Sequence, residues 1–183
     1  MKKNGLKSVI IVVFCACLCV GYYYYLTQRN NGKEDTMTET EMVISKDLEI
    51  SYPNTAREVV KFYNRILKCY YNEDCTQEQL EKMTEQARIL MDEELKKKNP
   101  KEAYLEAVKA DISNFEQEKI KISNINLERT DEIEYKTVKG KKCAYVDVDY
   151  YMKGKKTVRA SQTFILRKDD NSKWRILGFY AAK

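Results

Sequence analysis

Residues that could do acid–base or nucleophilic chemistry are scarce in this sequence. None of the 183 residues is histidine, which removes the commonest general base and both the Ser-His and Cys-His nucleophile pairs. The carboxylates within strong strand patterns are Asp147 and Asp149. They alternate with apolar residues at 146, 148 and 150, so we expect both acids on the solvated face of a sheet, exposed or ion-paired. The sequence therefore predicts no catalytic residues and no enzyme.

Tyrosine is abundant, with 14 in the chain. Four of them form the run Tyr22–Tyr25 at the end of an apolar segment. Four others lie on apolar stripes farther along the chain: Tyr63, Tyr104, Tyr150 and Tyr180. Such side chains can line a ligand pocket between helices and a sheet, or they can fill the core with their hydroxyls at its rim. The sequence leaves both interpretations open and favours core filling.

The six cysteines give no metal-binding pattern. Three lie in the apolar segment near the N-terminus, and Cys143 falls in a strand pattern. Cys69 and Cys75 flank a predicted turn, where a disulfide would close a loop of about seven residues and add ~2.4 kcal/mol of stability. Two free thiols are the alternative. Without histidine or a Cys-x-x-Cys pair we expect no metal site, and without a glycine-rich phosphate loop we expect no cofactor.

Ser8 to Leu26 is a run of 19 residues without a charge. As a helix at ~1.5 Å per residue it would span roughly 28 Å, close to the ~30 Å of a bilayer's hydrocarbon core. Lysines precede this run, and tyrosines suited to the membrane interface end it. We predict a cytoplasmic tail (1–7), a single-pass anchor in the cytoplasmic membrane (8–26) and an extracytoplasmic remainder. A cleaved or lipidated signal is the alternative, and it too would place the rest of the chain outside that membrane.

The net charge of +5 does not by itself indicate an anionic partner. Residues 34–118 contain 12 basic and 20 acidic side chains, whereas residues 119–183 contain 16 basic and 8 acidic ones. The basic half suggests nucleic acid or another anionic polymer. However, its lysine clusters flank one strand and lie ~30–35 Å apart, and an extracytoplasmic location removes ordinary nucleic acids. We therefore expect no nucleic-acid partner, and instead an envelope protein or a second copy of the chain.

The hydrophobic pattern changes from helical to alternating at about residue 118. A polar linker (27–50), with a short extended segment expected at 42–50, precedes a predicted folded domain at 51–183. Capping signals at Thr55, Thr76 and Asn99 mark three helix starts. Five alternating segments follow, at 120–127, 133–138, 142–152, 156–167 and 174–180. Their short connections make them antiparallel, so we predict an α+β domain with three helices packed on one face of a curved sheet.

Two details of the sheet follow from the phase of alternation. This phase slips at Ser123–Asn124, which predicts a bulge or bend in the first strand. A three-residue turn at 153–155 would keep apolar residues on one face of the strand pair and polar residues on the other. That turn would set Asp149 opposite Arg159, and the acid would then have a cross-strand partner.

This order of elements resembles the nuclear-transport-factor-2-like superfamily. The resemblance is carried by Ala56–Tyr63 (AREVVKFY) and by the closing strand pair, Phe164–Arg167 and Lys173–Ile176. It implies a cone-like domain, in a superfamily that includes enzymes, binding modules and membrane-tethered domains. With its anchor the chain is similar to single-pass bacterial proteins and to assembly subunits of conjugative type IV secretion machines. We therefore expect a binding or assembly module. A small-ligand carrier or enzyme using the cone interior, and a structural subunit of a secretion complex, are the alternatives.

Overall fold

The computed structural model describes Val20 and residues 37–182, and the chain divides into two compact units, Met1–Met37 and Thr38–Lys183. The predicted tail, nearly all of the predicted anchor and the linker up to residue 36 lie outside the described residues, so the anchor stays a prediction. No helix within the described part is long and apolar enough to cross a bilayer. All elements named below belong to the second unit.

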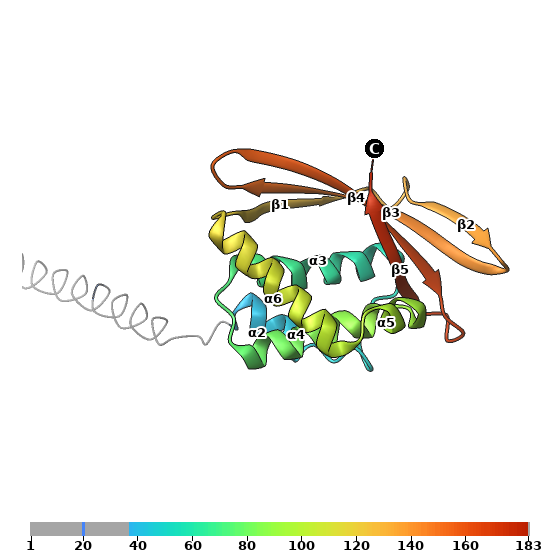
Figure 1. The fold of residues 1–183 in the computed structure, drawn as a ribbon. Coiled ribbons are helices and arrows are strands. Elements are labelled where there is room, and N and C mark those ends of the chain that lie inside the picture. Colours follow the sequence, from blue (N-terminus) through green and yellow to red (C-terminus); the bar gives the residue numbers. More distant parts are fainter. Residues whose placement is uncertain (1–19, 21–36, 183) are drawn as a thin grey trace, which may run out of the picture. The chain divides into compact units, whose positions relative to one another are not determined.

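The second unit is α+β, with a helical layer on one side of an antiparallel sheet (Figure 1). Its described helices are α2 (Glu39–Ser45), α3 (Ala56–Asn72), α4 (Gln77–Leu90), α5 (Glu93–Lys98) and α6 (Lys101–Gln117). Its strands are β1 (Lys121–Leu127), β2 (Glu134–Val138), β3 (Lys141–Lys153), β4 (Thr157–Lys168) and β5 (Trp174–Ala181). The strand order in the sheet is β1-β3-β4-β5. Strands β1 and β2 pair with the same edge of β3, β2 with residues 141–145 and β1 with residues 148–153.

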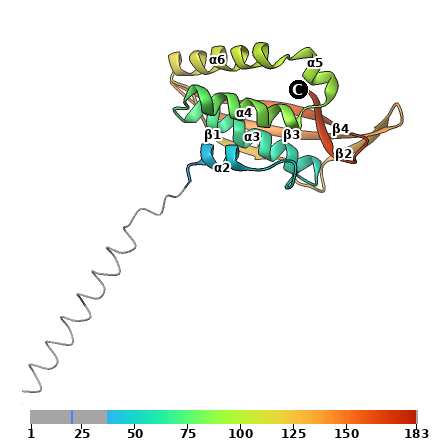
Figure 2. The same ribbon diagram turned by 90° about the horizontal axis from the view of Figure 1, so that it is seen from below.

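Helix α3 lies between the sheet and the other helices. The Thr55 hydroxyl accepts a hydrogen bond from the Glu58 N–H at 3.1 Å, and the Glu58 carboxylate accepts one from the Thr55 N–H at 3.1 Å. This capping box starts the helix as predicted. One side of α3 is buried against β1, β3 and β5, and the helix also contacts α2, α4 and α6. Figure 2 shows α6, α4 and α2 from below, with α3 behind them.

The helical layer has more elements than the three we predicted, since the described residues contain five helices. The expected second helix stops at Leu90 because Met91 turns extended and forms a bridge with Ile176 of β5. Asp92 then caps the short α5. Asn99, which we expected to cap the start of the third helix, is therefore the C-cap of α5, and Pro100 is the N-cap residue of α6. A long-range contact to the sheet causes this break.

The described end of the predicted linker is also ordered as a helix. The expected extended segment at 42–50 is wrong over residues 42–45, which belong to α2. Thr38 and Glu41 form a capping box at its start. Val43 and Leu48 are 0 % and 2 % exposed and belong to the core. Residues before Ser51 thus contribute to the packed domain.

The sheet confirms the predicted bulge or bend in the first strand and corrects the predicted turn. The register of β1 against β3 shifts between Ile122 and Asn124. Lys153 pairs with Thr157, so the β3–β4 connection is 154–156 and the register is two residues from the predicted one. A slip of two residues keeps every side chain on its expected face, and alternation alone cannot detect it. Asp149 lies opposite Ser161 and reaches Arg159 diagonally.

Candidate binding groove

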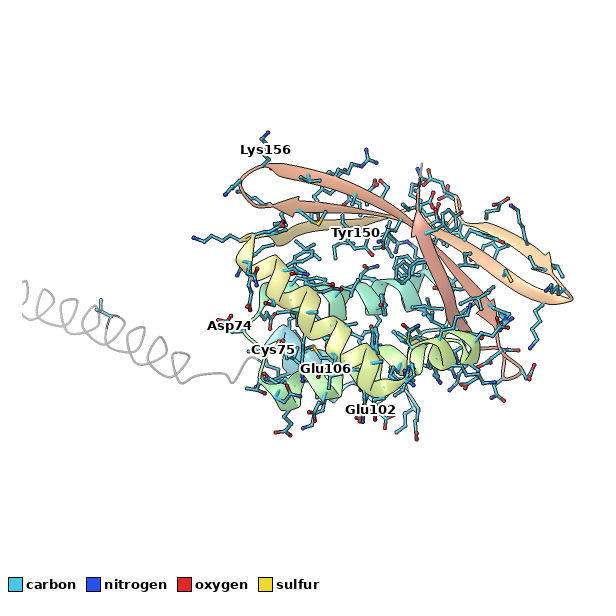
Figure 3. The ribbon with its side chains drawn as sticks, in the orientation of Figure 1. Asp74, Cys75, Glu102, Glu106, Tyr150 and Lys156 are labelled. Atoms are coloured by element: carbon cyan, nitrogen blue, oxygen red, sulfur yellow. The ribbon has the colours of Figure 1, made fainter. Side chains whose placement is uncertain are left out.

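Three of the four predicted pocket tyrosines meet in the core, and the fourth does not. The hydroxyls of Tyr63 and Tyr104 lie 3.3 Å apart. The Tyr150 hydroxyl donates a hydrogen bond to the Asn64 side-chain oxygen at 2.6 Å, in the space between sheet and helices (Figure 3). Tyr180 is 50 % exposed near the end of β5. The three clustered side chains fill the core with their hydroxyls paired.

The electrostatics of this cluster do not favour acid–base chemistry. Burial raises the pKa of Tyr63, Tyr104 and Tyr150 above the ordinary tyrosine value. Each phenol therefore stays protonated at neutral pH and acts as a hydrogen-bonding group. The ring of Phe164 packs edge-on against Tyr63 with centroids 5.8 Å apart. The residues between α3 and the sheet are thus a packed core.

The two strand carboxylates lie on the opposite face of β3, as predicted. Asp149 accepts hydrogen bonds from Arg159 Nε at 3.1 Å and Nη2 at 2.7 Å. These bonds, with one from Ser161, hold the pKa of Asp149 below its usual value. Asp147 accepts a hydrogen bond from the Thr163 hydroxyl at 2.6 Å. Both acids therefore take part in cross-strand pairing.

Cys69 and Cys75 are free thiols in this structure. The Cys75 sulfur lies 3.8 Å from the Cys69 carbonyl oxygen and 3.8 Å from the Thr40 hydroxyl. Burial raises the pKa of Cys69 to about 11. A bridge between these cysteines stays a prediction. Among the described residues, no three His, Cys, Asp or Glu side chains are grouped so that they could hold a metal ion.

A groove of about 560 Å³ runs between α3 and the edge strand β1. We call it the α3–β1 groove. Its lining residues are Arg57, Lys61, Asn64, Arg65, Lys68, Asn124, Ile125, Asn126 and Leu127. The first five lie along one side of α3 and the last four are consecutive in β1. The groove is therefore formed by one helix face and one strand edge.

All charged residues that line the α3–β1 groove are cations. Lys61 and Lys68 are exposed, and neither has an ion-pair partner within residues 37–182. Arg65 pairs with Glu39 of α2 at 2.6 Å. Arg57 donates from Nε to the Glu128 carbonyl oxygen at 2.8 Å, which leaves its terminal nitrogens available. The groove thus has a positive potential in an otherwise acidic helical layer.

Side chains of α3 hold the two ends of the β1 edge. At one end, the Asn72 amide accepts from the Ile122 N–H at 2.9 Å and donates to the Ile122 carbonyl at 2.7 Å. At the other end, Arg57 binds the carbonyl of Glu128, just after the strand. Among the described residues, no other strand covers the edge between them, because β1 pairs there with β3 alone. Such an edge can accept an added chain.

The hydrogen-bond pattern shows which backbone groups face the groove. The Glu128 N–H donates to the Asp147 carbonyl at 3.0 Å, so this pair belongs to the hydrogen-bonded positions of the β1–β3 ladder. Because antiparallel positions alternate, the N–H and C=O groups of Ile125 and Leu127 must point away from β3. No described residue forms a hydrogen bond to these outward groups. They are available to a ligand in the groove.

Asn64 connects the groove to the core. It is 2 % exposed, its nitrogen donates to the Val60 carbonyl at 2.9 Å, and its oxygen accepts from Tyr150. The side chain is therefore fixed by partners on both α3 and β3. This fixation gives the groove a rigid floor.

A second cavity, of about 680 Å³, lies at the C-terminal ends of α3 and α6. Its wall includes Tyr71 and Phe115, whose rings stack with centroids 4.1 Å apart. Both signs of charge line it: four lysines and the acids Glu73, Asp74 and Glu116. The charged residues of this cavity are therefore of both signs, whereas those of the α3–β1 groove are all positive.

The groove residues were missed by the sequence reasoning, although a signal existed. Residues 57, 61, 65 and 68 follow helical spacing and place four cations on one side of α3. Our charge counts covered whole segments, and the acidic residues of the other helices masked this stripe. Asn64 had no such signal, since its role depends on its hydrogen bond from Tyr150 on a distant strand.

Comparison with known proteins gives one family match. The sequence model of a family described as "Domain of unknown function (DUF6715)" matches residues 1–179. No curated protein matches the chain significantly.

Proposed function

The chain belongs to the DUF6715 family, whose description names no activity, and we propose that it is a membrane-anchored extracytoplasmic binding or assembly module. In this proposal the domain contacts its partner through the α3–β1 groove and carries out no reaction. The partner is another envelope protein.

The observation that carries the proposal is the contrast between the interior and the groove. The side chains between α3 and the sheet are buried: Val60 and Phe164 are 0 % exposed, and Asn64 is 2 % exposed and hydrogen-bonded. Among the described residues, the buried carboxylate is that of Asp92, and it forms an ion pair with Arg167. The groove, by contrast, is open and lined by cations. A filled interior beside an open charged edge favours protein binding over catalysis.

The membrane location and the finer fold assignment rest on the sequence. The uncharged run Ser8–Leu26 and the lysines before it support an anchor with the N-terminus inside. The succession of helices followed by an antiparallel sheet supports membership of the nuclear-transport-factor-2-like superfamily. Both belong to the proposal.

The test is affinity capture of the full-length protein from solubilised membranes. We would compare the wild type with Lys61→Glu/Lys68→Glu, which reverses two charges of the groove. The matched control is Lys155→Glu/Lys156→Glu, which makes the same charge change at two exposed residues of the β3–β4 turn (Figure 3 labels Lys156).

We expect the wild type and the control variant to capture the same envelope protein. The groove variant should capture at least about tenfold less of this protein, because reversing the two charges removes electrostatic steering and the ion pairs with the partner. Equal capture by all three proteins would reject the groove as the contact site. A second, differently tagged copy of the chain in the same membranes reports whether the captured partner is the protein itself.

A further inference from the structure

We infer that the α3–β1 groove binds an extended acidic segment of its partner, which pairs with β1 as an additional strand. This inference rests on the proposed function and names the kind of partner surface involved. Two independent features support it: the outward backbone groups of β1 and the spacing of the cations on α3.

The first feature is the edge of β1. Ile125 and Leu127 direct their N–H and C=O groups away from β3, as the alternation of the ladder requires. An incoming strand forms hydrogen bonds with such alternate residues of an edge. The two outward residues between the Asn72 and Arg57 contacts therefore provide two donors and two acceptors. A backbone in extended conformation is the ligand that fits them.

The second feature is the distance between cations. Arg57, Lys61 and Arg65 follow each other at intervals of four residues, which is about 6 Å along a helix. Alternate side chains of an extended strand are separated by about 6.6 Å. Helix α3 and β1 run antiparallel beside each other, with Asn72 at the start of β1 and Arg57 beyond its end. A strand added to β1 would thus present every second side chain to α3 in near register with its cations.

Charge complementarity decides which side chains these are. The charged lining residues are all positive, so the partner residues facing α3 are Asp or Glu. The stripe from Arg57 to Lys68 is about 16 Å long, which corresponds to about five extended residues. The expected ligand is therefore a short segment with carboxylates at alternate positions.

Binding of a synthetic peptide tests the inference directly. The probe is a fluorescently labelled hexapeptide, (Glu-Thr)₃, with both ends blocked. Fluorescence anisotropy measures its affinity for the full-length protein in lipid nanodiscs. Four peptides serve as comparisons: (Lys-Thr)₃, the rearranged Glu-Glu-Glu-Thr-Thr-Thr, and two forms of (Glu-Thr)₃ that carry N-methyl groups on the alternate amides of one register or of the other. Inorganic polyphosphate is a further comparison.

We expect (Glu-Thr)₃ to bind at least tenfold more tightly than the lysine and rearranged peptides. Binding should weaken at least tenfold in Lys61→Glu/Lys68→Glu, stay unchanged in Lys155→Glu/Lys156→Glu, and weaken when salt rises, because salt screens exposed charges. N-methylation in one of the two registers should also weaken it at least tenfold, because the methyl groups remove donors to β1.

Several results would overturn the inference. The groove would bind polyanions in general, without strand pairing, if the rearranged peptide, both N-methylated peptides or inorganic polyphosphate bound as tightly as (Glu-Thr)₃. No binding of (Glu-Thr)₃ would reject an acidic strand as the ligand. If membrane capture still depends on Lys61 and Lys68 in that case, the proposed function stands and only the ligand class is wrong.

Discussion

The Tyr150 hydroxyl on β3 donates a 2.6 Å hydrogen bond to the side-chain oxygen of Asn64 on α3. This bond joins the middle of the sheet to the floor of the α3–β1 groove. Both residues are buried, with exposed fractions of 6 % and 2 %. The bond adds to the contacts of Asn72 and Arg57 with β1 and the residue that follows it, which also fix α3 against the sheet.

Removing the Tyr150 hydroxyl should destabilise the domain. Tyr150→Phe leaves the Asn64 oxygen buried without its partner, which costs about 1–3 kcal/mol. Tyr151→Phe is the matched control, because this neighbour on the other face of β3 is only partly buried and its hydroxyl has no hydrogen bond among the described residues. Urea unfolding measures both. Equal stability of Tyr150→Phe and the wild type would show that the bond contributes nothing.

Amide hydrogen exchange should alternate along β1. The Ile125 and Leu127 N–H groups point away from β3, so we expect them to exchange at least ~100-fold faster than those of Asn126 and Glu128, which bond to β3. Exchange of the free protein followed by NMR resolves individual amides. Slow exchange at Ile125 and Leu127 would mean that the edge is already occupied.

The Asp92–Arg167 pair should matter for stability and for its pH dependence. Asp92 is 8 % exposed and accepts two hydrogen bonds from Arg167, at 3.0 and 2.6 Å. Arg167→Met should cost about 3 kcal/mol at pH 7, because it leaves a buried carboxylate without its partner. Arg159→Met, which removes an exposed pair on the same strand, should cost less than about 1 kcal/mol.

The pH dependence has a definite sign. Burial disfavours the charged form of Asp92, but the hydrogen bonds from Arg167 and the Glu94 N–H outweigh burial and lower its pKa. The stabilisation is therefore complete above the unfolded value of about 3.9, and it is lost as pH falls through the lower folded pKa. The difference between the wild type and Arg167→Met should shrink below about pH 4. A constant difference down to pH 2 would contradict this role.

Cys69 should react slowly with alkylating reagents. Burial raises its pKa from 9.0 to about 11, so its thiolate fraction at pH 8 falls about 100-fold. After reduction, iodoacetamide should modify Cys69 at least ~100-fold faster in urea than in the folded protein, as followed by mass spectrometry. Similar rates in both conditions would show that Cys69 is accessible and its pKa ordinary.

Local signals in the sequence predicted much of the fold. The capping boxes at Thr55 and Thr76, and the phase slip at Ser123–Asn124, are short-range patterns, and the structure contains all three features. The end of α4 was not predictable in this way, because the contact of Met91 with Ile176 spans a long stretch of chain. The β3–β4 register was missed because a two-residue slip keeps the same faces.

The candidate site was less predictable than the fold. Tyr63, Tyr104 and Tyr150 were found from their apolar stripes, and the structure brings them together in the core. The groove needed two things that a count of charges does not give: the side of α3 on which the cations lie, and the identity of β1 as an edge strand. Strand order depends on tertiary pairing, so the sequence alone could not place Ile125 and Leu127 at a free edge.

Site-specific photo-cross-linking in intact cells tests the central claim most directly. A photoreactive amino acid would replace Lys61 in the α3–β1 groove in one variant and Lys156 in the β3–β4 turn in another. We predict a discrete cross-linked product from position 61, absent from position 156 and lost when Lys68→Glu is added. A product from position 156 alone, or the same product from both positions, would contradict the assignment of the groove as the partner site.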